Sequence, residues 1–162
     1  MSTVRVGQGF DVHPLVAGRR MVLGGVAIPS HKGLLGYSDA DVLIHAICDA
    51  LLGAAGLPDI GQYFPPSDPR YKDADSSILL SQVLEELFKA GYDKIVNIDC
   101  VVMAERPKIN PHIPAMKKRI AEVLQVTEGQ IGIKATTCEK LGFVGREEGI
   151  AASAVCLISR HD

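Results

Sequence analysis

The sequence has no closely spaced pair of cysteines, no long apolar run and no room for a secretory signal. Its four cysteines, Cys48, Cys100, Cys138 and Cys156, include no C-x-x-C pair, which argues against a zinc ribbon, a dithiol redox motif and a disulfide framework. No apolar stretch reaches the ~20 residues that a membrane-spanning helix needs. A strand-like pattern begins at Val4, so we expect a cytoplasmic protein, or a plastid one whose transit peptide has been removed.

An excess of charge and the common phosphate-binding signatures are also lacking. The 17 basic residues nearly balance the 19 acidic ones, so no overall field favours nucleic acid or an anionic membrane as a partner. Neither G-x-x-x-x-G-K-[ST] nor G-x-G-x-x-G occurs, which argues against an ordinary P-loop or dinucleotide-binding fold. The 162 residues are 47% hydrophobic and show no internal repeat. We therefore predict a single domain spanning residues 1–162.

Apolar periodicity and turn residues predict an α+β fold in which helices cover one face of a mixed sheet. Residues 3–12 and 21–28 are expected to be extended, with a turn at 17–20 between them. Further strands are expected at 94–104, 130–137 and 150–159, and helices at 38–56, 76–90 and 110–125. The first helix has a capping-box-like start, Ser38-Asp39-Ala40-Asp41, and Asn110-Pro111 is expected to cap the last helix.

Two segments indicate how a site and an assembly are formed. Residues 57–75 carry four prolines and little periodicity, which is typical of a functional or mobile loop, and we expect a lid that faces the substrate. The strand at 150–159 has apolar or small residues at both alternating positions, which indicates that both faces of the sheet are covered. Because the predicted helices suffice for one face only, we expect the other face to pack against further copies of the chain.

Asp11-Val12-His13 is the sharpest local cluster of chemically active residues. Residues two apart on a strand point to the same side, so this carboxylate and imidazole project together. With His45 from the first helix they form an Asp-His-His set, a common open ligand set for a catalytic metal such as Zn²⁺, Mn²⁺ or Co²⁺. The alternative is an exposed Asp11–His13 pair and a buried histidine with satisfied hydrogen bonds.

Asp41, His45 and Asp49 are four residues apart and are expected to share one stripe of the first helix. If His45 binds a metal, a neighbouring carboxylate is expected to orient its ring. Solvent exposure is the alternative, and for Asp41 so is stabilisation of the helix dipole. Cys48 is predicted to be a small buried hydrophobic residue, although it could also serve as a ligand.

A second candidate site lies at residues 134–140, where a strand ends in a glycine-rich loop. Its hydroxyls, cations and backbone amides suit phosphate oxygens, and the carboxylate of Glu139 suits Mg²⁺. The stretch could equally be an ordinary charged loop. Residues 106–111 open a helix, so their amides and Lys108 could also receive an anion.

Nine segments spread over nearly the whole chain, taken together, resemble the 2-C-methyl-D-erythritol 2,4-cyclodiphosphate synthase family. This resemblance is far more specific than any single motif, and it makes the metal site the favoured interpretation. The segments are Gly9-Phe10-Asp11-Val12-His13, Gly24-Gly25-Val26-x-Ile28-Pro29, Lys32-Gly33-Leu34-Leu35, Ser38-Asp39-Ala40-Asp41-Val42-x-x-His45-Ala46, Gly53-Ala54-Ala55, Asp59-Ile60-Gly61, Phe64-Pro65-x-x-Asp68-Pro69, Lys134-Ala135-Thr136-Thr137-x-Glu139-Lys140-Leu141-Gly142-Phe143 and Gly145-Arg146-x-Glu148-Gly149-Ile150.

The resemblance implies a chorismate-mutase-like trimer fold, with a β-α-β-α-β-β core, a mixed four-stranded sheet and an N-terminal hairpin extension. It also implies a homotrimer with active sites between subunits and a role in non-mevalonate isoprenoid biosynthesis. The implied reaction is a phosphoryl transfer in which the 2-phosphate of 4-CDP-2-C-methyl-D-erythritol 2-phosphate attacks the β-phosphorus and expels CMP. An isoprenoid diphosphate in the central cavity of the trimer is a further candidate ligand.

The same resemblance implies the residues of the site. Asp11, His13 and His45 would hold Zn²⁺, Mn²⁺ or Co²⁺ against the diphosphate, and Glu139 would hold Mg²⁺ or Mn²⁺. Tyr37 and Thr137 would be catalytic. The other substrate contacts would be Val12 and Ser38 near the metal; Asp59, Ile60, Gly61, Phe64, Pro65, Pro66, Ser67 and Asp68 for the methylerythritol arm; Ala104, Glu105, Arg106, Pro107, Lys108, Ile109, Asn110, Thr136 and Cys138 for cytidine and its phosphates; and Phe143 and Arg146 at the rim.

The chain departs from the family pattern at Tyr37, where the family often has histidine. A phenol donates a hydrogen bond but supplies no positive charge near neutral pH. Our hypothesis is that Tyr37 preserves binding and slows turnover. Gln8 replaces another frequent histidine, which we interpret as peripheral.

Two other functions fit the same residues. A metal-dependent phosphoesterase would use a metal-bound water as nucleophile and would release linear phosphates. A trimeric sensor would bind an isoprenoid diphosphate and catalyse nothing. Analysis of the reaction products separates the phosphoesterase from the cyclodiphosphate synthase, and ligand binding without turnover would identify the sensor.

Overall fold

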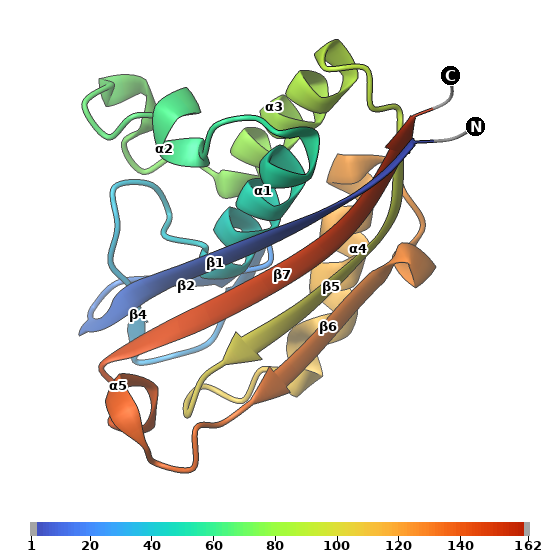
Figure 1. The fold of residues 1–162 in the computed structure, drawn as a ribbon. Coiled ribbons are helices and arrows are strands. Elements are labelled where there is room, and N and C mark those ends of the chain that lie inside the picture. Colours follow the sequence, from blue (N-terminus) through green and yellow to red (C-terminus); the bar gives the residue numbers. More distant parts are fainter. Residues whose placement is uncertain (1–2, 161–162) are drawn as a thin grey trace.

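The computed structural model describes residues 3–160 as two layers, a twisted mixed sheet and a layer of helices on one of its faces (Figure 1). The main sheet has the strand order β4-β1-β7-β5-β6, in which only β5 and β6 are parallel. Its strands are β1 (Thr3–Ala17), β4 (Lys32–Leu34), β5 (Lys94–Met103), β6 (Ile131–Thr136) and β7 (Gly149–Arg160).

Three long helices form the second layer: α1 (Val42–Ala55), α3 (Ser76–Lys89) and α4 (Ile113–Leu124). Two four-residue helices, α2 (Ile60–Tyr63) and α5 (Gly142–Gly145), lie in the loops, with 3₁₀ turns at Pro69–Tyr71, Asn110–His112 and Glu128–Gln130. Within residues 3–160, no helix is both long and apolar enough to cross a membrane. The predicted α+β class, with helices on one face of a mixed sheet, is confirmed.

The N-terminal hairpin differs from the prediction. β1 continues to Ala17 and lies inside the main sheet, where it pairs with β7 and β4. The sheet therefore has five strands, the expected four and the short strand β4. The hairpin instead forms within residues 21–28, between β2 (Met21–Leu23) and β3 (Val26–Ile28). Gly24 and Gly25 both have positive φ angles, which is the backbone that a tight two-residue hairpin turn requires.

The capping residues were also predicted wrongly. α1 begins at Val42, and its N-cap is Asp41, whose carboxylate accepts the backbone N–H of Ile44 at 3.1 Å. The same carboxylate accepts the N–H groups of Gly24 and Gly25, so Asp41 joins the hairpin to the helix and does not share a helical stripe with His45. Burial raises the pKa of Asp41. Asn110-Pro111 forms a 3₁₀ turn before α4. The N-cap residue of α4 is His112, whose side chain makes no capping hydrogen bond.

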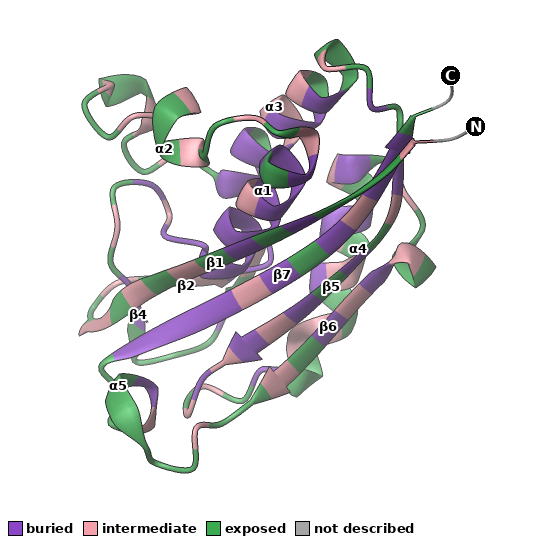
Figure 2. Cartoon of the chain, in the orientation of Figure 1, coloured by how far each residue is buried: buried purple, intermediate pink, exposed green. Residues whose placement is uncertain are grey.

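α1 packs directly on β1 and is buried along nearly its whole length (Figure 2). A Cβ atom on Gly7 would lie 1.9 Å from the carbonyl oxygen of Ala50, so the helix backbone touches the strand backbone. Cys48 is fully buried in this layer, as predicted, and burial raises the pKa of its thiol. The small residues therefore set the distance between helix and strand.

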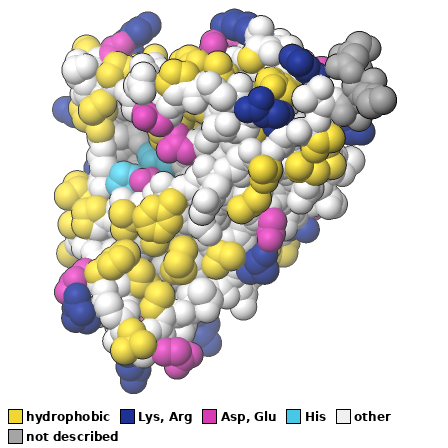
Figure 3. Space-filling model, in the orientation of Figure 1, with side chains coloured by type: hydrophobic (Ala, Val, Ile, Leu, Met, Phe, Trp, Pro, Cys, Tyr) yellow, Lys and Arg dark blue, Asp and Glu magenta, His cyan; other side chains and the backbone are white. Residues whose placement is uncertain are grey.

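The other face of the sheet is apolar and exposed in the single chain. Val4, Val6, Phe10 and Val12 on β1 and Val155 on β7 all project from it. In the space-filling view, apolar side chains gather over this face (Figure 3). Exposed apolar patches of this kind are typical of association surfaces.

Candidate metal centre and substrate site

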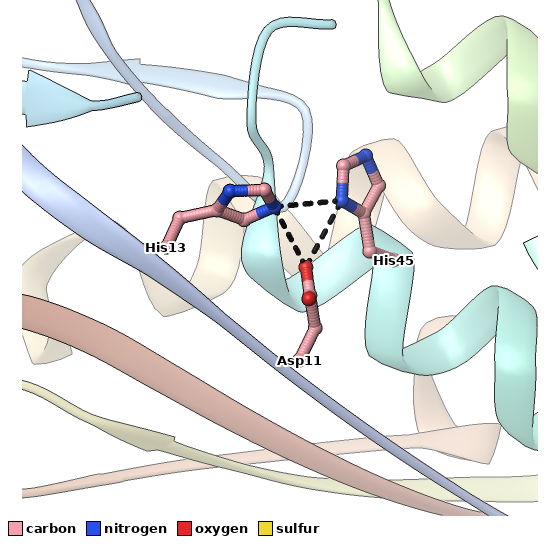
Figure 4. A group of neighbouring side chains, drawn as sticks. All are labelled: Asp11, His13 and His45. Carbon is pink, nitrogen blue, oxygen red and sulfur yellow. Dashed lines mark hydrogen bonds and ion pairs between the residues drawn. The ribbon is translucent and has the colours of Figure 1, made fainter. Parts of the chain in front are cut away.

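The strand alternation of β1 directs Asp11 and His13 toward the helix layer. Gly7, Gly9, Asp11 and His13 occupy every second position and share the face on which α1 lies. The glycines bring α1 close, and beyond them the two polar side chains reach toward His45 on the same helix (Figure 4). The predicted convergence of these three residues is confirmed.

The three side chains meet through one atom each. His13 Nε2 lies 2.9 Å from Asp11 Oδ2, His45 Nδ1 lies 3.0 Å from the same oxygen, and the two nitrogens are 3.2 Å apart. Ligands placed about 2.0–2.2 Å from a tetrahedral zinc are separated from one another by roughly 3.3 Å. The spacing therefore fits one small divalent cation with open positions for a further ligand.

The backbone fixes which nitrogen of His13 faces this centre. His13 Nδ1 lies 2.9 Å from the carbonyl oxygen of Leu35. Because a carbonyl only accepts hydrogen bonds, Nδ1 carries the proton and Nε2 of the neutral ring presents a lone pair. Gly36 makes room for this ring, since a Cβ atom there would lie 2.9 Å from His13 Cε1.

The electrostatics of the cluster favour a bound cation. Burial by itself would raise the pKa of Asp11, but its hydrogen bonds to His13 and His45 outweigh burial and lower that pKa to about 2. Burial opposes protonation of His13, yet contact with Asp11 raises its pKa above the ordinary value. A carboxylate and two imidazole nitrogens pointing at one another require a shared positive charge, from either protons or a metal.

A cavity of about 160 Å³ opens beside the metal ligands. Two connections shape it: Tyr37 donates its hydroxyl to the carbonyl of Asp68 at 3.3 Å, and Asp49 accepts the N–H of Ile60 at 2.9 Å. The segment expected to be a lid facing the substrate contains α2 and is tied to α1. The cavity is lined by His13, Tyr37, Ser38, His45, Ile60, Gly61, Phe64, Pro66, Tyr71 and Leu79.

A second, larger cavity of about 870 Å³ is lined in part by residues 105–108, four of those expected to bind cytidine and its phosphates. Beside it, the loop after β6 is held by Glu105, whose Oε1 accepts the backbone N–H groups of Cys138 and Lys140. Lys134 does not line this cavity, because its side chain pairs with Asp99 on the exposed face of the sheet. The cavity is lined by Leu15, Pro29, Ser30, His31, Lys32, Glu105, Arg106, Pro107, Lys108, Lys140, Gly145 and Glu147.

The two groups of predicted residues contribute to separate cavities of the described chain. α2, near the metal cavity, and α5, near the second one, lie at opposite ends of the molecule (Figure 1), and none of the lining residues is common to both cavities. Val12 points to the outer face of the sheet, away from Asp11 and His13. The other predicted residues lie within four sequence positions of a lining residue: Asp59, Pro65, Ser67 and Asp68 in one group, and Ala104, Ile109, Asn110, Thr136, Thr137, Cys138, Glu139, Phe143 and Arg146 in the other.

Sequence reasoning missed several contacts of the site. The partner of His13 is a backbone carbonyl, which leaves no trace in residue type. Tyr71 and Leu79 line the metal cavity, and Ser76 contacts His45, although Ser76 was interpreted only as the start of a helix. The carboxylate expected to orient His45 from its own helix stripe acts instead from another segment, Asp39, through Ser76.

An Asp-His-His group that can hold a metal ion, beside a largely apolar cavity on an α+β scaffold, indicates a metal-dependent enzyme. The model of the YgbB family matches residues 4–159, and the chain belongs to this family. Curated relatives from Geobacillus sp. (strain WCH70) and Nitrosomonas europaea are 58% and 57% identical to it, covering 96% and 100% of this chain and 98% and 99% of their own. Both are named 2-C-methyl-D-erythritol 2,4-cyclodiphosphate synthase.

Solved structures agree with this assignment. A structure described as a CDP complex of IspF from Plasmodium falciparum has a TM-score of 0.86 at 36% identity and covers 98% of this chain and 97% of its own. The bifunctional IspDF from Campylobacter jejuni has a TM-score of 0.95 at 42% identity. It covers all of this chain, which spans only 44% of that longer polypeptide.

Proposed function

We propose that the chain converts 4-CDP-2-C-methyl-D-erythritol 2-phosphate into 2-C-methyl-D-erythritol 2,4-cyclodiphosphate and CMP, a step of non-mevalonate isoprenoid biosynthesis in the cytoplasm. The Asp11–His13–His45 centre, in a chain 58% identical to a synthase of that name, is the observation that carries this proposal. Both reacting groups are anions, so catalysis needs charge neutralisation and in-line positioning more than a strong nucleophile. The single domain of residues 1–162 would carry the whole activity.

Two cation sites fit this chemistry. Asp11, His13 and His45 would hold Zn²⁺, Mn²⁺ or Co²⁺, and Glu139 would hold Mg²⁺ or Mn²⁺ together with substrate phosphates. Such cations supply Lewis acidity and neutralise charge that develops on the diphosphate. Glu139 has a left-handed backbone and an exposed side chain, so its carboxylate faces outward from the loop that Glu105 holds.

The residues of the chain would divide the binding of substrate between them. Those of the first cavity, with Asp59 and residues 64–68, would hold the methylerythritol arm, and Tyr37 with Ser38 would orient the transferring phosphate. Residues 104–110 with Thr136 and Thr137 would hold cytidine and its phosphates. Phe143 and Arg146 would close the pocket. This division follows the two cavities described above.

A homotrimer of the chorismate-mutase-like type would unite the two groups. Because the groups line separate cavities in one chain, a neighbouring subunit would have to supply the cytidine-binding group to a given metal centre. The exposed apolar face of β1 and β7 offers the surface for this assembly. The central cavity of such a trimer would be apolar, and an isoprenoid diphosphate is its candidate ligand.

One experiment tests the proposal. Metal-loaded protein is incubated with the CDP-methylerythritol phosphate substrate and Mg²⁺, and CMP and the second product are followed before and after chelation. We expect the cyclic diphosphate and CMP in equal amounts, loss of activity on chelation and none in Asp11→Ala. Linear phosphates formed with uptake of water would identify a phosphoesterase, and binding without turnover a sensor; either result would refute the proposal.

A further inference from the structure

The side of His45 that faces away from the metal centre is enclosed by hydroxyl groups. Its Nε2 lies 2.9 Å from Ser76 Oγ and 3.2 Å from Ser38 Oγ. Ser76 is the first residue of α3 and is fully buried, and Ser38 is nearly so. Because both hydroxyls are shielded from solvent, their hydrogen bonds decide which nitrogen of the imidazole carries the proton.

Asp39 decides the direction of the shorter of these two hydrogen bonds. Ser76 Oγ lies 2.5 Å from Asp39 Oδ1, and the backbone N–H of Ser76 donates to Asp39 Oδ2 at 2.9 Å. An ionised carboxylate only accepts, so the single hydroxyl proton of Ser76 is donated to Asp39. Ser76 Oγ then offers His45 lone pairs alone, and the 2.9 Å contact must run from Nε2–H to Oγ.

This direction determines which nitrogen of His45 can bind a cation. A neutral imidazole that carries its proton on Nε2 presents a lone pair at Nδ1. Nδ1 is the atom that lies 3.0 Å from Asp11 Oδ2 and 3.2 Å from His13 Nε2. We propose that Asp39 and Ser76 are positioning residues which, through the chain Asp39–Ser76–His45, hold the His45 ring in the tautomer that commits Nδ1 to the metal.

The longer contact to Ser38 supports the ring without setting its tautomer. Ser38 Oγ already accepts the backbone N–H of Ala40 at 3.2 Å, and its distance from Nε2 is greater than that of Ser76. Asp39, in contrast, receives only donors: Ser76 through two groups and the N–H of Asp41 at 3.1 Å. The backbone N–H groups of Ser76 and Asp41 therefore hold the Asp39 carboxylate in place. The hydrogen-bond chain to His45 begins from an acceptor of fixed position.

Metal affinity measures this hydrogen-bond chain directly and independently of the phosphoryl-transfer chemistry. The zinc dissociation constant of metal-stripped protein is measured by competition with a chromophoric chelator. Removing the group that hydrogen-bonds the far nitrogen of a ligating histidine weakens metal binding by about 10–100-fold, and we expect a loss of that size in Ser76→Ala. Ser76→Thr retains the oxygen and should recover most of the affinity.

Ser77→Ala is the matched control. Ser77 is the next residue, is also buried, and its hydroxyl has no hydrogen-bond partner among the described residues. Removing this hydroxyl makes the same chemical change in the same helical turn, and the zinc affinity should be unchanged. Circular dichroism of each variant shows whether the fold is intact.

NMR of the imidazole nitrogens tests the tautomer without any substitution. In the parent protein loaded with zinc, His45 should carry its proton on Nε2, with that proton protected by a hydrogen bond. In folded Asp39→Ala, the freed hydroxyl proton of Ser76 can turn toward Nε2, so metal-free protein should gain the Nδ1–H form. Parental zinc affinity in folded Ser76→Ala, an Nδ1–H tautomer in the zinc-loaded parent, or a parent that binds no zinc would each overturn the proposal.

Discussion

Gly9 on β1 lies directly beneath Ala46 on α1, so close that a Cβ atom on Gly9 would be 1.9 Å from the carbonyl oxygen of Ala46. Gly9 is two residues before Asp11, and Ala46 directly follows His45. The contact between these two small residues therefore sets the distance across which the carboxylate and the imidazole meet. Since the clash would involve helix backbone, no side-chain rotation could relieve it.

Substitution of Gly9 by alanine should damage both stability and metal binding. Overpacking of a tight core costs about 1–3 kcal/mol and sometimes more, and we expect Gly9→Ala to reach the upper end of that range in urea unfolding. Zinc affinity should fall as α1 moves away. Gly53→Ala is the control, because Gly53 is exposed on α1 and a Cβ atom there would meet only the carbonyl oxygen of Gln8, at 3.8 Å. This substitution should be neutral or stabilising. Equal stability of the two variants would contradict this account of the interface.

A charge on the outer face of the sheet should prevent assembly. Val6 is 67% exposed in the single chain and lies on the face proposed to meet neighbouring subunits. Val6→Glu should yield monomers in sedimentation experiments and lose at least about tenfold in kcat/KM, which is ~1.4 kcal/mol, because the site would lack its cytidine-binding half. Ile78→Glu, on α3 and 56% exposed, is the matched control and should remain assembled. A Val6→Glu protein that is trimeric and active would refute the proposed interface.

Exchange of Tyr37 for histidine should accelerate turnover. The Tyr37 hydroxyl donates to the carbonyl of Asp68 beside the metal cavity and carries no positive charge. An imidazole at this position can be protonated and stabilise the transferring phosphate, so we expect kcat to rise several-fold with little change in KM. Tyr37→Phe, which removes the donor, should lower kcat instead. If Tyr37→His leaves kcat unchanged, the proposed role of this residue is wrong.

The cysteines should differ sharply in reactivity. Burial raises the pKa of Cys48 well above its usual range and those of Cys100 and Cys156 to about 12. An alkylating agent reacts with the thiolate, so at about pH 8 these three thiols should remain unmodified in folded protein. Cys138 is partly exposed in the loop after β6 and should be modified. Mass spectrometry should find one label per chain, none in Cys138→Ser, and slower labelling when CDP is present.

Much of the fold was predictable from local pattern. The strand at 150–159, the helix at 76–90 and its stop at Gly91 depend on periodicity and on terminating residues, which act within a few positions. The α1 start was misplaced because Ser38, Asp39 and Asp41 are all good capping residues. Contacts of Asp41 with Gly24 and Gly25, remote in sequence, decide among them.

The amino-acid sequence by itself determined that Asp11 and His13 share a face, because strand residues alternate and no partner is needed to enforce that. It also determined the register of small residues that admits a helix to that face. Only the tertiary structure decided that His45 arrives at the same point, that Asp39 reaches it through Ser76, and that residues 105–108 line a separate cavity. The contacts of His45 with Asp11 and of Asp39 with Ser76 join residues 34 and 37 positions apart, and such distances are closed by packing of whole layers, which no local pattern encodes.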